Sequence, residues 1–207
     1  MRHKVLLPTD FSKNSIRAIN YARELYKNDH CDFYLLNVFS ATGETHSRKT
    51  AFGSTAIYIM EKVRNCPVLV VPENAKIELP KEIVFPSSYR NHFKRRELIH
   101  LYDIAKKSNA NIAVLHIKEE DKLDEEQEEN IKLLKEILTG VSYTFHTLPH
   151  YSIQTAVNIF VESRSSDMVA FINKKHTFFG SILSSPMVKE ISFHLNVPIL
   201  AMHDLRN

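Results

Sequence analysis

Short apolar runs alternate with amphipathic stretches along most of this chain of 207 residues. Eight runs have the length and composition of strands: 5–7, 33–39, 68–71, 83–85, 112–117, 143–147, 168–172 and 198–202. Helical spacing predicts helices from Ser12 to about 27, up to about 64, and at 94–107, 124–138, 153–162 and 187–193. Strands that alternate with helices predict right-handed crossovers and a mostly parallel sheet.

Several of these segments carry a more local signal. Ser12 is a plausible N-cap for the first helix, and Gly140 is expected to end the helix at 124–138. The apolar run 33–39 is continuous, as expected for a strand whose two faces are both covered. The acidic run from Glu119 to Glu129 predicts the solvated face of a helix.

The sequence contains an internal repeat, and this repeat determines the expected domain organisation. Pro8 pairs with Pro86, and Asn37 pairs with His116. Farther along, the offset between the copies increases by 53 residues, so the second copy contains a segment near 118–174 that the first copy lacks. The repeat predicts a shortened first domain at 1–74, a linker at 75–80 and a complete second domain at 81–207.

Three motifs resemble the universal stress protein family: Pro8-Thr-Asp-Phe-Ser12, Cys66-Pro-Val-Leu-Val-Val71 and Asp167-Met-Val-Ala-Phe-Ile172. The resemblance covers nearly the whole chain as a tandem pair. It implies an α/β fold with a doubly wound parallel sheet of strand order 3-2-1-4-5. The truncated first domain is expected to have about three strands, and the second domain five. It also implies a stress-response role and, in one branch of the family, binding of ATP or AMP.

That branch carries the motif Gly-x2-Gly-x9-Gly-Ser/Thr, a loop whose glycines let backbone amides approach phosphate oxygens at a helix N-terminus. In the first domain Gly43, Gly53 and Ser54 match its later part, with Ser40 in place of the first glycine. The resemblance implies contacts of Pro8, Thr9 and Asp10 with adenine or ribose, of Val38 with the base, and of Gly53, Ser54 and Thr55 with phosphates.

The shortened first domain leaves an alternative open, because Gly43 and Gly53 also suit turn and cap positions retained from a nucleotide-binding ancestor. In the second domain Lys175 and Ser185 replace the motif glycines, and Ser88 replaces Asp10, so nucleotide binding of this kind is not expected there. Two function classes follow: a nucleotide-responsive stress protein, or an interaction and dimerisation module without nucleotide or catalysis.

Other chemistry has little support in the sequence. No Ser-His-Asp order or paired carboxylates favour hydrolysis, and the spacing around His146 and His150 identifies no metal site. The net charge of +3 is too small to imply a nucleic-acid partner, and no apolar run approaches the ~20 residues of a membrane span. The first residues enter a strand directly, without a recognisable signal peptide, which favours a cytoplasmic location. Cys31 and Cys66 lack metal-type spacing and suit a reducing compartment.

The family resemblance also implies how the two halves interact. The closing strands 68–71 and 198–202, both apolar edge-type strands, are expected to meet antiparallel, either between the domains or across a homodimer. The short first domain should be unable to fold alone, because its core is small. It is expected to leave five apolar side chains for the second domain or another chain to cover: Phe33, Leu35, Leu36, Ile57 and Ile59.

Overall fold

The computed structural model describes residues 3–37, 59–60, 63, 65–118, 122–149, 152–173 and 195–203. The elements follow one another as β1 (His3–Pro8), α1 (Lys13–Leu25), β2 (Cys31–Leu36), β3 (Val68–Val70), β4 (Glu82–Pro86), α3 (Arg95–Ser108), β5 (Asn111–Lys118), α4 (Glu125–Ile137), β6 (Ser142–Pro149), α5 (Ile153–Arg164), β7 (Met168–Asn173) and β8 (Ile199–His203). The helix expected at 187–193 lies outside the described residues, as does most of the one expected to end near 64.

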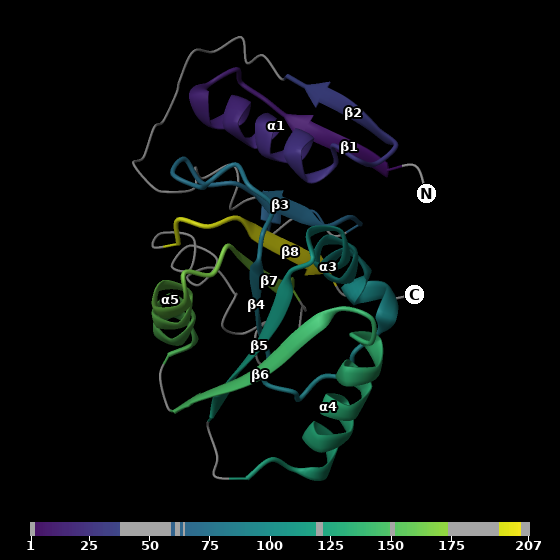
Figure 1. Cartoon of the computed structure of the whole chain (residues 1–207), viewed down its shortest axis with the longest axis vertical. Coiled ribbons are helices and arrows are strands. Elements are labelled where there is room, and N and C mark those ends of the chain that lie inside the picture. The colour runs from purple at the N-terminus through teal and green to yellow at the C-terminus, as the bar shows by residue number, and fades with distance from the viewer. Residues whose placement is uncertain are drawn as a thin grey trace.

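The larger sheet has the strand order β3-β8-β7-β4-β5-β6. Its strands β4 to β8 are parallel, so the predicted five-stranded order 3-2-1-4-5 is confirmed. Figure 1 shows α3 and α4 on one face and α5 on the other. Alternate residues of β4 and β5 enter the apolar cores beneath these two layers, which explains why both strands are apolar throughout.

Strand β3 adds to the far edge of this sheet and runs antiparallel to β8. The register pairs Val68 with Ala201, Leu69 with Leu200 and Val70 with Ile199. The prediction that the two closing strands meet is therefore confirmed, and they meet within one chain. This pairing covers an edge of β8 that would otherwise be an apolar template for aggregation.

The first residues form a smaller unit in which β1 and β2 pair only with each other among the described residues. Helix α1 makes the crossover, and Ser12 caps it as predicted, its side chain accepting a hydrogen bond from the Ser15 amide. The expectation that the strand at 33–39 is covered on both faces is wrong for Phe33 to Leu36, which are all exposed. The expectation that the short first domain leaves Phe33, Leu35 and Leu36 uncovered is confirmed. Ile59 is half-buried, and Ile57 lies outside the described residues.

Helix α1 anchors the β1–β2 unit to the rest of the chain (Figure 1). Tyr21 and Leu25 are buried in the same apolar core as side chains of α3, α4 and β8. The Arg17 guanidinium donates to the carbonyl of Ala75 with its Nε at 3.0 Å. Lys107 of α3 forms an ion pair with Asp29, which follows α1. The smaller unit therefore depends on the larger one for part of its core.

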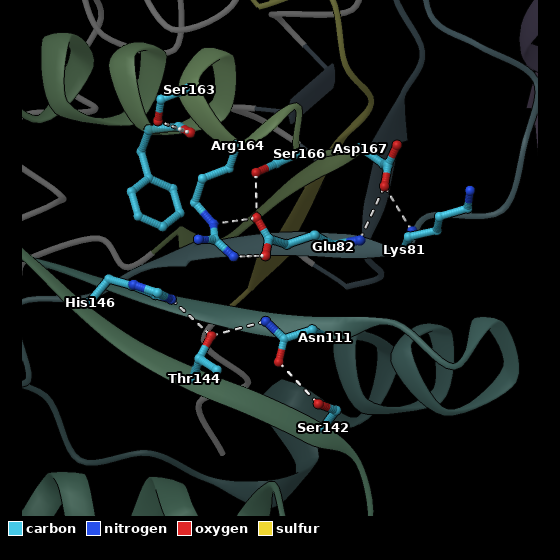
Figure 2. Close-up of polar contacts among 11 residues, drawn as sticks. Lys81, Glu82, Asn111, Ser142, Thr144, His146, Ser163, Arg164, Ser166 and Asp167 are labelled. Carbon is cyan, nitrogen blue, oxygen red and sulfur yellow. Dashed lines mark hydrogen bonds and ion pairs between the residues drawn. The ribbon is translucent and has the colours of Figure 1, made fainter.

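Polar side chains tie together the amino ends of the parallel strands (Figure 2). Arg164 donates to both carboxylate oxygens of Glu82, and Ser166 donates to one of them. These hydrogen bonds, first of all those from Arg164, lower the pKa of the Glu82 carboxyl. Asp167 accepts from the backbone amides of Lys81 and Glu82. Internal contacts occupy this end of the sheet, whereas ligands of open α/β sheets collect at the carboxyl ends of the strands.

The helices that the structure describes include none that is long and apolar enough to cross a membrane.

Candidate functional site

The loop after β1 lies at the carboxyl ends of β1 and β2. The amide of Thr9 donates to the carbonyl of Leu36 at 2.8 Å, which continues the parallel pairing by one residue. Phe11 then adopts a left-handed backbone with φ of +59°. This conformation costs about 1–2 kcal/mol for a residue with a Cβ atom. The Phe11 amide donates to Thr9 Oγ1 at 3.0 Å, a local bond that favours this turn.

Asp10 presents a carboxylate at the open side of this loop. One of its oxygens, Oδ1, accepts from the Ser12 amide at 2.9 Å, and the residue is exposed. Hydrogen bonds, first that of the Ser12 hydroxyl and then that of the Ser12 amide, lower the pKa of Asp10 to about 2. Its negative charge lies beside the N-terminus of α1, where the helix dipole favours an anion. Asp10 is therefore a pre-positioned hydrogen-bond acceptor at neutral pH.

Thr9 is buried and holds the loop to its surroundings. Its hydroxyl donates to Ser15 Oγ at 3.0 Å, and its carbonyl accepts from the Asn37 side chain at 2.7 Å. The sequence interpretation missed Asn37 and Ser15 as residues that support this loop. The repeat did contain a signal for Asn37, because it places that residue opposite His116.

The loop after β4 repeats these hydrogen bonds. The Ser87 amide donates to the carbonyl of Leu115 at 2.8 Å, and the Tyr89 amide donates to Ser87 Oγ at 3.1 Å. Tyr89 has the same φ of +59° as Phe11. Nδ1 of His116 contacts the Ser87 carbonyl at 3.0 Å, as Asn37 contacts Thr9. Since a carbonyl only accepts, this ring nitrogen carries the proton.

Helix α4 closes this second loop. Gln127 donates to the Ser88 carbonyl at 2.9 Å, and Asn130 donates to the Tyr89 carbonyl at 2.8 Å. The Tyr89 ring stacks on His116 with 4.8 Å between ring centroids. The cavity next to Ser88 has a volume of about 10 Å³, room for about one water molecule. Ser88, Tyr89 and His116 are all buried, so this loop offers little space for a ligand.

The predicted site residues fall into two groups. Pro8, Thr9 and Asp10 lie together at the carboxyl end of β1. Five others lie outside the described residues: Val38, Gly43, Gly53, Ser54 and Thr55. Asp10 and Thr9 are therefore the polar side chains of the predicted site whose geometry the structure describes.

Solved structures share this architecture. A universal stress protein from Archaeoglobus fulgidus DSM 4304 matches with a TM-score of 0.70 and 12% sequence identity, over 96% of this chain and 95% of that one. The chain has the universal stress protein fold. A putative universal stress protein from Pseudomonas aeruginosa UCBPP-PA14 matches with a TM-score of 0.57 and 12% identity, over 97% of this chain and 82% of that one. A protein of unknown function from Pseudomonas aeruginosa PAO1 matches to the same extent.

The similarity to these proteins is one of structure. The sequence itself matches no family model and no curated protein. The universal stress protein fold nevertheless bears on the location of the site. In open α/β sheets, ligands collect at the carboxyl ends of the strands, near the point where the strand order reverses. In the larger sheet that point lies between β4 and β7, beside the closed loop of Ser88. In the smaller unit the corresponding loop carries Asp10 and is open.

Proposed function

We propose that the chain is a member of the universal stress protein family that acts in a stress response and binds ATP or AMP at the loop after β1. The observation that carries this proposal is Asp10, an exposed carboxylate with a lowered pKa at the carboxyl end of a parallel strand. A carboxylate in this position suits the hydroxyl groups of a ribose, which donate hydrogen bonds to it.

The proposal includes an internal repeat with a shortened first half at 1–74, a linker at 75–80 and a complete second half at 81–207. The matching hydrogen bonds of the two loops support it, since Thr9 and Ser87, and likewise Asn37 and His116, have the same roles. Within this proposal Pro8 and Thr9 line the adenine or ribose site beside Asp10. Val38 lines the base pocket, and Gly43, Gly53, Ser54 and Thr55 form the phosphate loop.

Calorimetric titration of the whole protein with ATP and with AMP tests this function. Asp10→Ala should weaken binding about 10-fold to 100-fold, because a hydrogen bond to a charged group contributes about 1.5–3 kcal/mol. Gly53→Val should weaken it as well, since a branched side chain keeps the backbone away from phosphate. Ser88→Ala is the matched control in the closed loop and should leave affinity unchanged. Absence of binding heat with both nucleotides, or equal affinity in Asp10→Ala, contradicts the proposal.

The second candidate function is an interaction module that carries no nucleotide. One observation favours it: seven of the ten large apolar side chains that are exposed among the described residues lie between Leu6 and Leu36. The two functions are distinguished by the adenine absorbance and mass spectrum of purified, denatured protein. Bound adenine supports the first, and its absence together with no binding in the titration supports the second.

A further inference from the structure

A cavity of about 490 Å³ lies between the second half of α1, the start of β2 and the segment that joins β3 to β4. Its walls combine three apolar side chains, Tyr26, Phe33 and Ile77, with polar groups of α1 and of the turn that follows it. Small-molecule sites usually have volumes of about 300–1,000 Å³ and this mixture of aromatic, aliphatic and polar walls. The cavity lies toward the amino end of β2, whereas Asp10 lies at the opposite end of α1. We call it the α1 cavity.

Two walls of the α1 cavity are held in place by contacts outside it. The Arg17 guanidinium donates to the carbonyl of Ala75, which is buried, and this bond fixes the segment of Ile77 against α1. On the other side, Lys107 Nζ lies 4.2 Å from the centroid of the Tyr26 ring and keeps that ring in position. A ligand therefore meets walls that are already ordered, which lowers the entropic cost of binding.

The charges around the α1 cavity leave one cation available. The carboxylate of Glu24 forms an ion pair with Lys27, and that of Asp29 forms one with Lys107. Arg23 lines the same cavity and is exposed, and among the described residues no hydrogen bond or ion pair engages its guanidinium. The cavity thus presents aromatic walls beside a single cation without a counterion.

We propose that the α1 cavity binds a small aromatic carboxylate, with its ring against Phe33 and Tyr26 and its carboxylate on Arg23. The forked donors of a guanidinium match the two oxygens of a carboxylate, and aromatic rings pack well against one another. A dianion such as a phosphate monoester fits less well, because Glu24 and Asp29 also line the cavity and would repel its second charge. An uncharged aromatic ligand would leave the donors of Arg23 unused.

This site goes beyond the proposed function and shares no residue with it, since Thr9 and Asp10 do not line the α1 cavity. The two can therefore fail separately. A protein that binds ATP or AMP but no aromatic carboxylate overturns only the α1 cavity as a site, and the reverse result overturns only the nucleotide site.

Two probes that differ only in charge, 2-naphthoate and its uncharged analogue 2-naphthamide, test the site in the full chain. In an NMR titration at neutral pH, 2-naphthoate should shift the amide signals of Arg23, Lys27 and Phe33, and leave those of Phe11 and Ser12 in place. Its dissociation constant should be about 1 mM or tighter, as expected for a ligand of about 13 non-hydrogen atoms. The amide should bind about 10-fold more weakly. No shifts at about 10 mM 2-naphthoate, or shifts confined to the loop after β1, overturn the proposal.

Three variants identify the groups that bind the probe. Arg23→Gln should raise the dissociation constant of 2-naphthoate about 10-fold and leave that of 2-naphthamide unchanged, because only the charged probe uses the guanidinium. Phe33→Leu should weaken both probes about 3-fold, since it removes an aromatic contact. Arg95→Gln is the matched control, because Arg95 is an exposed arginine of α3 outside the cavity, and it should change neither affinity. Unchanged binding of 2-naphthoate by Arg23→Gln contradicts the proposal.

Discussion

Phe11, in the loop after β1, is 61% exposed, whereas Tyr89, at the matching place in the loop after β4, is 4% exposed. The backbone of the two residues has the same φ, and both amides donate to the hydroxyl two residues earlier. The shape of each loop is thus set by local bonds and by one side chain from the neighbouring strand, Asn37 or His116. The two loops differ in whether a neighbouring helix covers them.

In the larger unit the cover is α4, whose Gln127 and Asn130 bind the carbonyls of the loop. Helix α4 lies in the segment near 118–174 that the expected repeat assigns to the second copy alone. Loss of such a segment would leave the loop shape intact and open its outer side, where Asp10 now lies. If the repeat is of this kind, the same loss would also leave β2 uncovered, and Phe33 to Leu36 are exposed.

The largest effect is expected when the smaller unit is separated from the larger one. A fragment of residues 1–76 should not fold, because Tyr21 and Leu25 lose the core that they share with α3 and β8. Circular dichroism during heating should show no cooperative transition for this fragment. A monomeric fragment that unfolds cooperatively would show that the smaller unit needs neither the larger unit nor a second molecule. It would contradict the dependence of the smaller unit on the shared core.

A smaller effect is expected from removal of the cover of the closed loop. Asn130→Ala leaves the buried carbonyl of Tyr89 without its donor and should cost about 1–3 kcal/mol of unfolding free energy. Glu129→Ala, at the exposed neighbouring position on α4, is the control and should change the free energy by less than about 0.5 kcal/mol. Urea denaturation at neutral pH measures both. Equal stability of Asn130→Ala and the control would mean that α4 does not hold the loop.

The smallest expected effect is on the pH dependence of stability, and it comes from the carboxylate of Asp10 in the loop after β1. The pKa of Asp10 in the folded protein is about 2, below its usual value. The stability that the charged carboxylate adds to the folded state is therefore complete above pH ~4 and is lost as the pH falls through 2. Because Asp10 is exposed, solvent screening limits this contribution to less than about 1 kcal/mol. Asp10→Asn should remove this part of the pH dependence between pH 4 and 2, and Ser88→Ala should not. An NMR titration of the Asp10 carboxyl with a midpoint near 4 would contradict the pre-positioned carboxylate.

Much of the fold could be predicted because local signals in the sequence mark its strands and helices. Apolar runs located the strands, Ser12 marked the start of α1, and the family resemblance implied the strand order. The apolar run 33–39 alone predicted the wrong cover for β2, because a continuous apolar run looks the same whether its faces are buried or open. The expected small size of the first domain predicted correctly that Phe33, Leu35 and Leu36 are left uncovered.

The candidate site was predicted less completely. Thr9 and Asp10 could be placed at a strand end from their position after an apolar run. Their supporting partner Ser15 belongs to no motif, and the pairing of Asn37 with His116 in the repeat did not reveal that Asn37 binds the loop. The acidic run was interpreted as a solvated helix face, and Glu125, Glu126 and Glu128 are indeed exposed. Gln127, within the same run, is buried against Ser88, because one helical face turns inward every three to four residues.

Amide hydrogen exchange at Phe11 and Tyr89 tests the comparison most directly. Both amides donate to a hydroxyl two residues earlier, at 3.0 and 3.1 Å, so their local protection is matched and a difference in rate reports the surroundings. We expect the Tyr89 amide to exchange at least about 100-fold more slowly than the Phe11 amide, after correction for intrinsic rates. Equal protection of the two amides would contradict it, since the loop after β1 would then be covered as completely as the loop after β4.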